Sequence, residues 1–251
     1  MQLKLRQANI FYETWGQGEP VILLHGGFGS NQDFKGQIPA LAKTFRVIGF
    51  ERPGHGHTAD TNEPFTFPLM TNYTIDFIEA LKLAPANIVG WSDGAIIALF
   101  LALSRPDLVK TIVSIGGNFA LSGLSKAFLD WLGSATPESF KKVDTAGVEL
   151  YEKISPDGPE HFPIVFEKTK KLWLEQPRIS TKDLEKISAP TLVMVGDKEM
   201  ISLEHTLELY RSINNAELCI VPGTTHFLLS EKPRTTSAII LEFLTTSAKN
   251  L

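Results

Sequence analysis

The chain has 251 residues, of which 43% are hydrophobic and 21% charged, and its formal net charge is −4. This composition excludes an intrinsically disordered chain, and the weakly acidic balance leaves no basic surface for nucleic acid. The single cysteine, Cys219, excludes an internal disulfide and a multi-thiolate metal site. Because the first residues lack a secretory apolar core and the longest apolar run, Ala95 to Leu103, is too short to span a bilayer, we expect a cytoplasmic protein without membrane association.

Strand and helix patterns alternate through the first part of the chain. Short apolar runs that end at glycine, proline or polar residues are typical of buried strands, and longer runs with helical spacing are typical of helices. We predict strands at residues 2–7, 9–15, 20–24, 45–50, 87–91 and 109–115, and helices at 33–43, 70–83 and 93–104.

The middle of the chain, residues 118–186, shows no strand pattern. It divides into amphipathic pieces near 122–133, 137–153 and 160–175, separated by prolines, and we interpret it as a helical insertion. The alternation then resumes with strands at 191–196 and 217–221 and helices at 203–213 and 232–247.

Strands that alternate with helices predict a mostly parallel sheet with helices on both faces. Ligands of such sheets bind beyond the carboxyl ends of the strands. The loops that follow the strands are therefore the places in which to look for chemistry.

One of these loops carries Gly90-Trp91-Ser92-Asp93-Gly94, which fits the pattern G-x-S-x-G between a strand and a helix. A sharp strand-to-helix turn lifts the serine hydroxyl clear of the backbone, and the glycines allow the strand and helix to approach closely. The helix N-terminus also directs free N–H groups toward a developing oxyanion. The simpler alternative is that Ser92 only caps the helix.

A serine nucleophile needs a histidine base, and the histidine needs a carboxylate that orients it. His226 follows the last strand, whereas the other five histidines lie in earlier loops, a helix or the insertion. Asp197 directly follows the strand at 191–196, and Glu199 is the competing acid in the same loop. We predict that Ser92, His226 and Asp197 converge at one end of the sheet.

These motifs resemble those of the α/β-hydrolase superfamily over essentially the whole chain: the HGG turn at 25–27, ERPGHGHT at 51–58, GWSDG at 90–94, GDKE at 196–199 and PGTTH at 222–226. The resemblance implies an eight-stranded, mostly parallel sheet, with a core of residues 1–117 and 187–251 and a helical cap of residues 118–186 after the sixth strand. One departure is Glu51, where the family usually has aspartate.

The resemblance also implies site roles. Ser92 matches the nucleophile, Asp197 the acid and His226 the base, and the backbone N–H groups of Gly27 and Asp93 match the oxyanion hole, with Phe28 as the alternative to Gly27. The implied activity is a serine hydrolase without a cofactor that cleaves a small, mostly apolar ester, lactone, thioester or amide. The alternatives are a small-molecule receptor or regulatory protein on the same fold, a cofactor-free haloperoxidase and a C–C bond hydrolase.

Aromatic and methionine residues near the site loops and in the insertion suggest an apolar substrate pocket. The candidates are Phe28, Phe119, Trp131, Phe162, Phe166, Met200 and Phe227. The carboxylate of Asp93 either caps the helix or attracts a cationic substrate group. His55 and His57 lack nearby metal-ligand partners in sequence, so we expect surface loop residues and no metal site. The oligomeric state is not encoded in any of these patterns.

Overall fold

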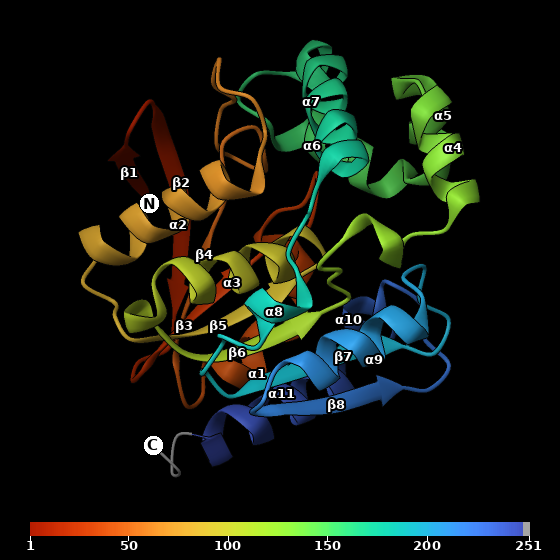
Figure 1. The fold of residues 1–251 in the computed structure, drawn as a ribbon. Helices are drawn as coiled ribbons and strands as arrows, with labels where there is room; N and C mark the ends of the chain where they lie inside the picture. The colour runs from red at the N-terminus through yellow and green to blue at the C-terminus, as the bar shows by residue number, and fades with distance from the viewer. Residues whose placement is uncertain (248–251) are drawn as a thin grey trace.

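The computed structural model describes residues 1–247, and its sheet has the strand order β1-β2-β4-β3-β5-β6-β7-β8 (Figure 1). The first two strands pair antiparallel with each other, β2 pairs antiparallel with β4, and all remaining pairs are parallel. The predicted eight-stranded, mostly parallel sheet is therefore confirmed. The strands are β1 Gln2–Leu5, β2 Ala8–Trp15, β3 Pro20–Leu24, β4 Arg46–Phe50, β5 Ala86–Trp91, β6 Val109–Ile115, β7 Thr191–Gly196 and β8 Ala216–Val221.

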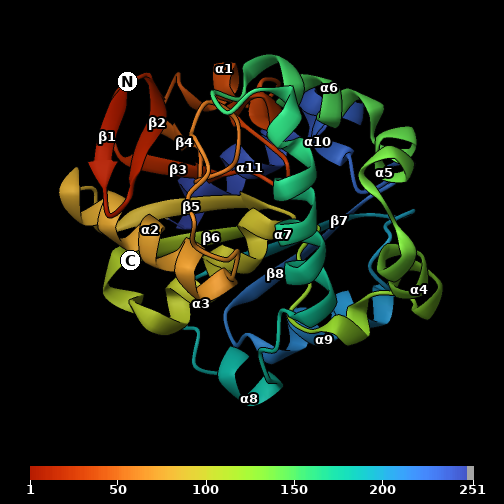
Figure 2. The ribbon, with the colours of Figure 1, turned by 90° about the horizontal axis from the view of Figure 1, so that it is seen from above.

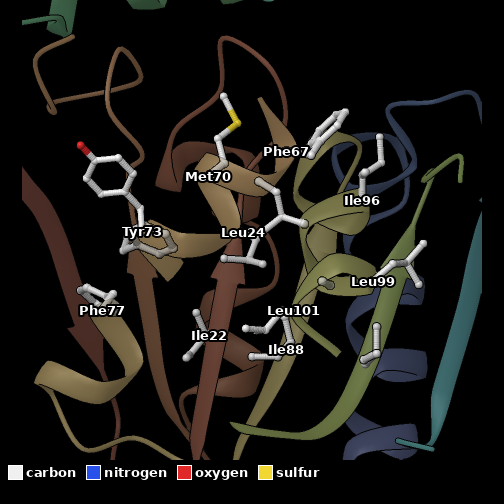
Figure 3. Packing of buried hydrophobic residues seen from close by; sticks show 14 of the residues in the cluster. Ile22, Leu24, Phe67, Met70, Tyr73, Phe77, Ile88, Ile96, Leu99 and Leu101 are labelled. Atoms are coloured by element: carbon white, nitrogen blue, oxygen red, sulfur yellow. The ribbon is translucent and has the colours of Figure 1, made fainter. Parts of the chain in front are cut away.

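Helices cover both faces of this sheet. The helices that belong to the sheet layers are α1 Ile38–Leu41, α2 Phe67–Ala80, α3 Asp93–Ser104, α8 Thr181–Leu184, α9 Leu203–Ser212, α10 Leu228–Glu231 and α11 Pro233–Ser247. Figure 1 shows α2, α3 and α9 on one face and α1 and α11 on the other. Strand side chains alternate between two apolar clusters, so Ile22 and Leu24 face α2 and α3, while Val21 and Leu23 face α1 and α11. Figure 3 shows part of the cluster that contains Ile22 and Leu24.

Two predicted helix boundaries in the first part of the chain were wrong. The helix predicted at 70–83 begins at Phe67, because the Thr66 hydroxyl accepts a hydrogen bond from the Leu69 amide and caps the helix there. The helix predicted at 33–43 is a 3-10 turn at Asn31–Phe34 followed by the short α1. Gly36 lies between them and Pro39 restricts the backbone of the second piece, so one continuous helix does not form.

The insertion between β6 and β7 is helical, and within the described chain it contains no strand of the sheet. Its four longer helices are α4 Lys126–Ser134, α5 Pro137–Val143, α6 Thr145–Ile154 and α7 Phe162–Glu175. They lie together over the carboxyl end of the sheet (Figures 1 and 2). The single piece predicted at 137–153 is two helices, because the Asp144 carboxylate accepts from the Gly147 amide and starts α6.

Polar contacts close the base of the insertion and tie its far side to the core. At its base, the Ile179 amide donates to the Phe119 carbonyl at 2.9 Å, and Ala120 and Arg178 form an antiparallel bridge. At its far side, the Lys168 ammonium on α7 binds the nearly buried Asp60 carboxylate of a core loop at 2.7 Å. No helix within residues 1–247 is long and apolar enough to cross a membrane.

Candidate active site

Ser92 occupies a strained turn between β5 and α3. Its φ of 54° and ψ of −120° fall in a region that side chains rarely adopt, and its amide donates to the Ile115 carbonyl at 2.8 Å. Glycine is required on both sides. A Cβ on Gly90 would lie 2.2 Å from the Gly94 carbonyl oxygen, and one on Gly94 would lie 1.9 Å from the Leu24 carbonyl oxygen. The turn therefore presents the serine hydroxyl at the carboxyl end of the sheet.

His226 lies between this hydroxyl and a carboxylate. Its Nε2 is 3.0 Å from Ser92 Oγ, and its Nδ1 is 2.7 Å from Glu199 Oε1. The Trp91 indole N–H donates to the His226 carbonyl at 2.9 Å and fixes the loop that carries the imidazole. The Glu199 side chain is only 4% exposed, so its contact with His226 is shielded from water.

The predicted contact between Asp197 and His226 is wrong. The Asp197 carboxylate instead accepts from the Thr224 amide at 3.0 Å, and hydrogen bonds from the Gly223 and Thr224 backbone hold its pKa below the usual range. These bonds join the loops after β7 and β8 and turn Asp197 away from the imidazole. Glu199, two residues further along, is the carboxylate that reaches it.

Gly27 and Asp93 line the same cavity as Ser92. Their backbone amides have no hydrogen-bond partner among residues 1–247, so both are free to donate to an external acceptor. Phe28 has a φ of 55°, so the backbone turns sharply directly after Gly27. A Cβ at Gly27 would lie 2.4 Å from the Trp173 ring, so the indole covers this turn closely.

Ser92, Asp93, Gly27 and His226 line a cavity of about 200 Å³ between the sheet and the insertion. Most of its wall is apolar and comes from both layers. The core contributes Phe67, Trp91, Ile96, Met200, Ile201 and Phe227, and the insertion contributes Leu124, Phe128, Trp131, Phe140, Val143, Trp173 and Pro177. Its polar wall residues besides those of the site are Asn118, Asp144 and Gln176.

A model of the α/β-hydrolase fold matches residues 19–151, more than half of the chain. The chain belongs to the α/β-hydrolase family. Several of its relatives in that family are hydrolases. It is 22% identical to an (E)-2-((N-methylformamido)methylene)succinate hydrolase of Acinetobacter baylyi, over 98% of each chain. It is 26% identical to a pimeloyl-[acyl-carrier protein] methyl ester esterase of Neisseria meningitidis, over 82% of this chain and 85% of the relative.

A solved structure of a meta-cleavage product hydrolase from Pseudomonas fluorescens IP01 superposes on this hydrolase fold with a TM-score of 0.82. The two sequences are 24% identical, and the match covers 96% of this chain and 95% of the other. At this identity the likeness shows the shared fold.

Four of the predicted pocket residues line the hydrolase cavity, namely Phe28, Trp131, Met200 and Phe227. The other three were placed wrongly. Phe119 stacks on His205 with ring centroids 3.9 Å apart, outside the cavity. Phe162 and Phe166 are buried behind Phe28, at centroid distances of 5.5 and 6.4 Å, and form the interior of the insertion.

The Asp93 carboxylate makes no capping hydrogen bond to α3 within residues 1–247, where Ser92 is the N-cap residue. Its two carboxylate oxygens accept from the Trp173 indole N–H at 2.9 and 3.1 Å, which ties the helix after the serine to α7 of the insertion. Burial raises the pKa of Asp93, while the nearby Arg52 charge and the Trp173 bond act in the opposite direction. Trp173 is not among the predicted pocket residues, and nothing in its sequence spacing indicated this bond.

The HGH segment differs from the predicted surface loop. His55 is buried, and burial lowers its pKa to about 3, whereas His57 is partly exposed and binds the Glu51 carboxylate through Nδ1 at 2.9 Å. Within residues 1–247 no group of three or more histidine, cysteine or acidic residues is arranged to hold a metal ion.

Proposed function

We propose that the chain hydrolyses a small, mostly apolar carboxylic ester, lactone, thioester or amide through an acyl-enzyme on Ser92. The observation that carries this proposal is the continuous chain of contacts from Ser92 Oγ to His226 Nε2 and from His226 Nδ1 to Glu199, at the wall of an apolar cavity. The contacts have the order and lengths that nucleophile, base and orienting acid require.

The reaction follows from these positions. His226 Nε2 takes the hydroxyl proton as Ser92 Oγ attacks the substrate carbonyl, and Glu199 stabilises the imidazolium that forms. The N–H groups of Gly27 and Asp93 donate to the oxyanion of the tetrahedral intermediate. His226 then gives the proton to the leaving alcohol, thiol or amine. Water, activated by the same imidazole, attacks the acyl-enzyme and releases the acid.

The cavity supports a preference among substrates. Its aromatic and aliphatic wall favours an apolar acyl or alcohol group, and its volume of about 200 Å³ fits a modest one. The methyl ester esterase among its relatives agrees with ester chemistry. The Asp93 carboxylate in the wall disfavours an anionic group beside the scissile bond and favours a neutral or amine-bearing one.

A panel of p-nitrophenyl esters tests the proposal. Wild type should turn over short acyl esters, and Ser92→Ala should lose this activity by several orders of magnitude. An organophosphonate should add its mass to the peptide that contains Ser92. Equal, slow hydrolysis by both proteins, together with no label on Ser92, would instead favour a receptor that keeps the hydrolase fold. Paired neutral and amine-bearing esters test the role of Asp93.

A further inference from the structure

Arg52 lies directly behind the Gly26-Gly27 turn and does not line the cavity. Its side chain is fully buried, and its guanidinium donates to two carbonyls of the turn: Nη1 to His25 at 2.8 Å and Nη2 to Gly26 at 2.9 Å. Its own amide donates to His25 Nε2 at 3.1 Å. Burial lowers the pKa of Arg52 to about 10, so the group remains cationic at neutral pH.

The second of these carbonyls belongs to the peptide group that matters for the reaction. The Gly26 carbonyl and the Gly27 N–H are the two ends of one planar unit, and in a trans peptide they point in opposite directions. A hydrogen bond from a cation to the carbonyl end therefore fixes the direction of the N–H and polarises it as a donor. The His25 ring nitrogen Nδ1 lies 2.8 Å from the same carbonyl oxygen and holds it from another side.

We propose that Arg52 is a positioning residue of the oxyanion hole, acting on the oxyanion through the Gly26-Gly27 peptide without contacting the substrate. The inference rests on the proposed hydrolase function. No bond to Arg52 forms or breaks during the reaction. Arg52 keeps the Gly27 N–H directed at the oxyanion and places a positive charge close to the developing negative charge.

The charged surroundings explain why a buried cation is useful here. A buried charge is costly unless it is compensated, and a neutral donor could hold the turn at lower cost. The carboxylates that offset the Arg52 charge are Asp33 and Asp93, and neither makes a hydrogen bond to the guanidinium within residues 1–247. Asp33 instead accepts from the Gly26 amide at 3.3 Å, and burial raises its pKa to about 7.

The guanidinium therefore directs its hydrogen bonds at the turn and not at these carboxylates, which offset part of its charge through space. The other titratable groups that face Arg52 are His25 and His55. Burial lowers the pKa of both imidazoles, so both are neutral at neutral pH.

A trifluoromethyl ketone labelled with ¹³C at its carbonyl provides a direct readout. Serine hydrolases form a hemiketal with such ketones, and its chemical shift reports the pH at which the oxyanion ionises. We compare wild type with Arg52→Lys, which keeps the charge with a less suitable donor geometry, and Arg52→Gln, which removes the charge. Arg105→Gln is the matched control, because that guanidinium is on the surface and pairs with Asp107 and Glu79.

The expected result for Arg52→Gln is ionisation of the adduct at least one pH unit higher than in wild type. Both kcat and the affinity for the ketone should fall about 10- to 100-fold, with KM changed less than threefold. Arg52→Lys should recover part of each loss, and Arg105→Gln should behave as wild type. A loss of stability with kcat and adduct titration unchanged would assign Arg52 a purely structural role and overturn the proposal.

Asp33→Asn keeps the test decisive if the Arg52 variants do not fold. The asparagine oxygen can still accept from the Gly26 amide, and at about pH 8, above the Asp33 pKa of about 7, the substitution removes a negative charge that offsets Arg52. At that pH the ketone should bind the variant more tightly than wild type, and an unchanged affinity at that pH contradicts the proposal. If wild type forms no adduct on Ser92, the hydrolase function itself fails, which separates the two conclusions.

Discussion

The carboxylate partner of His226 offers the sharpest quantitative test of the site. In Glu199→Gln the amide oxygen should occupy the position of Oε1, because two donors converge there, His226 Nδ1 at 2.7 Å and the Met200 amide at 2.8 Å. The imidazole then keeps its tautomer, and the loss is the negative charge beside the imidazolium. Two charges about 4 Å apart in an effective dielectric of about 20 interact by about 4 kcal/mol. We therefore expect kcat to fall about a thousandfold.

The assay compares kcat on a p-nitrophenyl ester for wild type, Glu199→Gln and Asp197→Asn. The matched Asp197→Asn variant retains an acceptor for the Thr224 amide, so kcat should stay within about threefold of wild type. Circular dichroism and the urea midpoint of unfolding confirm that each variant is folded. A thousandfold loss in Asp197→Asn with normal kcat in Glu199→Gln would refute the assignment of Glu199.

Three further predictions concern the surroundings of the site. Gly27→Ala should lower kcat/KM about tenfold, because the new methyl group meets the Trp173 ring. Adding Trp173→Leu should restore part of the loss. If kcat/KM does not recover, the clash with Trp173 is not the cause. Burial lowers the pKa of His205 to about 4 in the folded state, against about 6.5 in the unfolded state. Between these pH values the unfolded state binds more protons. The free energy of unfolding should therefore fall as the pH drops from about 6.5 to about 4. Urea unfolding should show a shallower pH dependence in His205→Gln, and equal slopes would exclude this contribution. Asp60→Asn should lower the free energy of unfolding by about 1–3 kcal/mol, because Lys168 loses its carboxylate partner. Amide hydrogen exchange in α7 should become faster. Unchanged exchange would show that the Asp60–Lys168 pair does not hold the helix.

The sequence predicted the sheet and two members of the site because each rests on a short, local signal. Ser92 lies in a glycine-flanked turn between an apolar strand and an apolar helix, and His226 follows the last strand closely. Such positions are determined by the strands themselves, which bring their carboxyl ends to one edge of the sheet.

The acid could not be chosen by the same reasoning. Asp197 and Glu199 are two residues apart in one loop, and either side chain could be aimed at His226. The choice depends on the Thr224 amide in a different loop, which holds Asp197 away. That contact joins segments 27 residues apart and leaves no pattern in the local sequence.

The residues that line the cavity could not all be predicted from the local sequence either. Phe162 and Phe166 lie one helical turn apart on α7 and share a face. Their spacing does not determine whether this face points to the cavity or to the interior of the insertion. The packing of Phe140 and Phe28 decides between the two, because these rings lie between the pair and the serine side of the molecule.

The bridge between Ala120 and Arg178 has an evolutionary consequence. Because the two ends of the helical segment leave the core side by side, the intervening residues form a cassette that can lengthen, shorten or be exchanged without altering the register of β6 and β7. Recombination at this neck would exchange the part of the cavity wall that the insertion supplies while leaving Ser92, His226 and Glu199 in place. A transplant of residues 121–177 from a related hydrolase would thus replace nine residues of the wall in one step, while the core residues of the wall, Phe28 and Met200 among them, would stay.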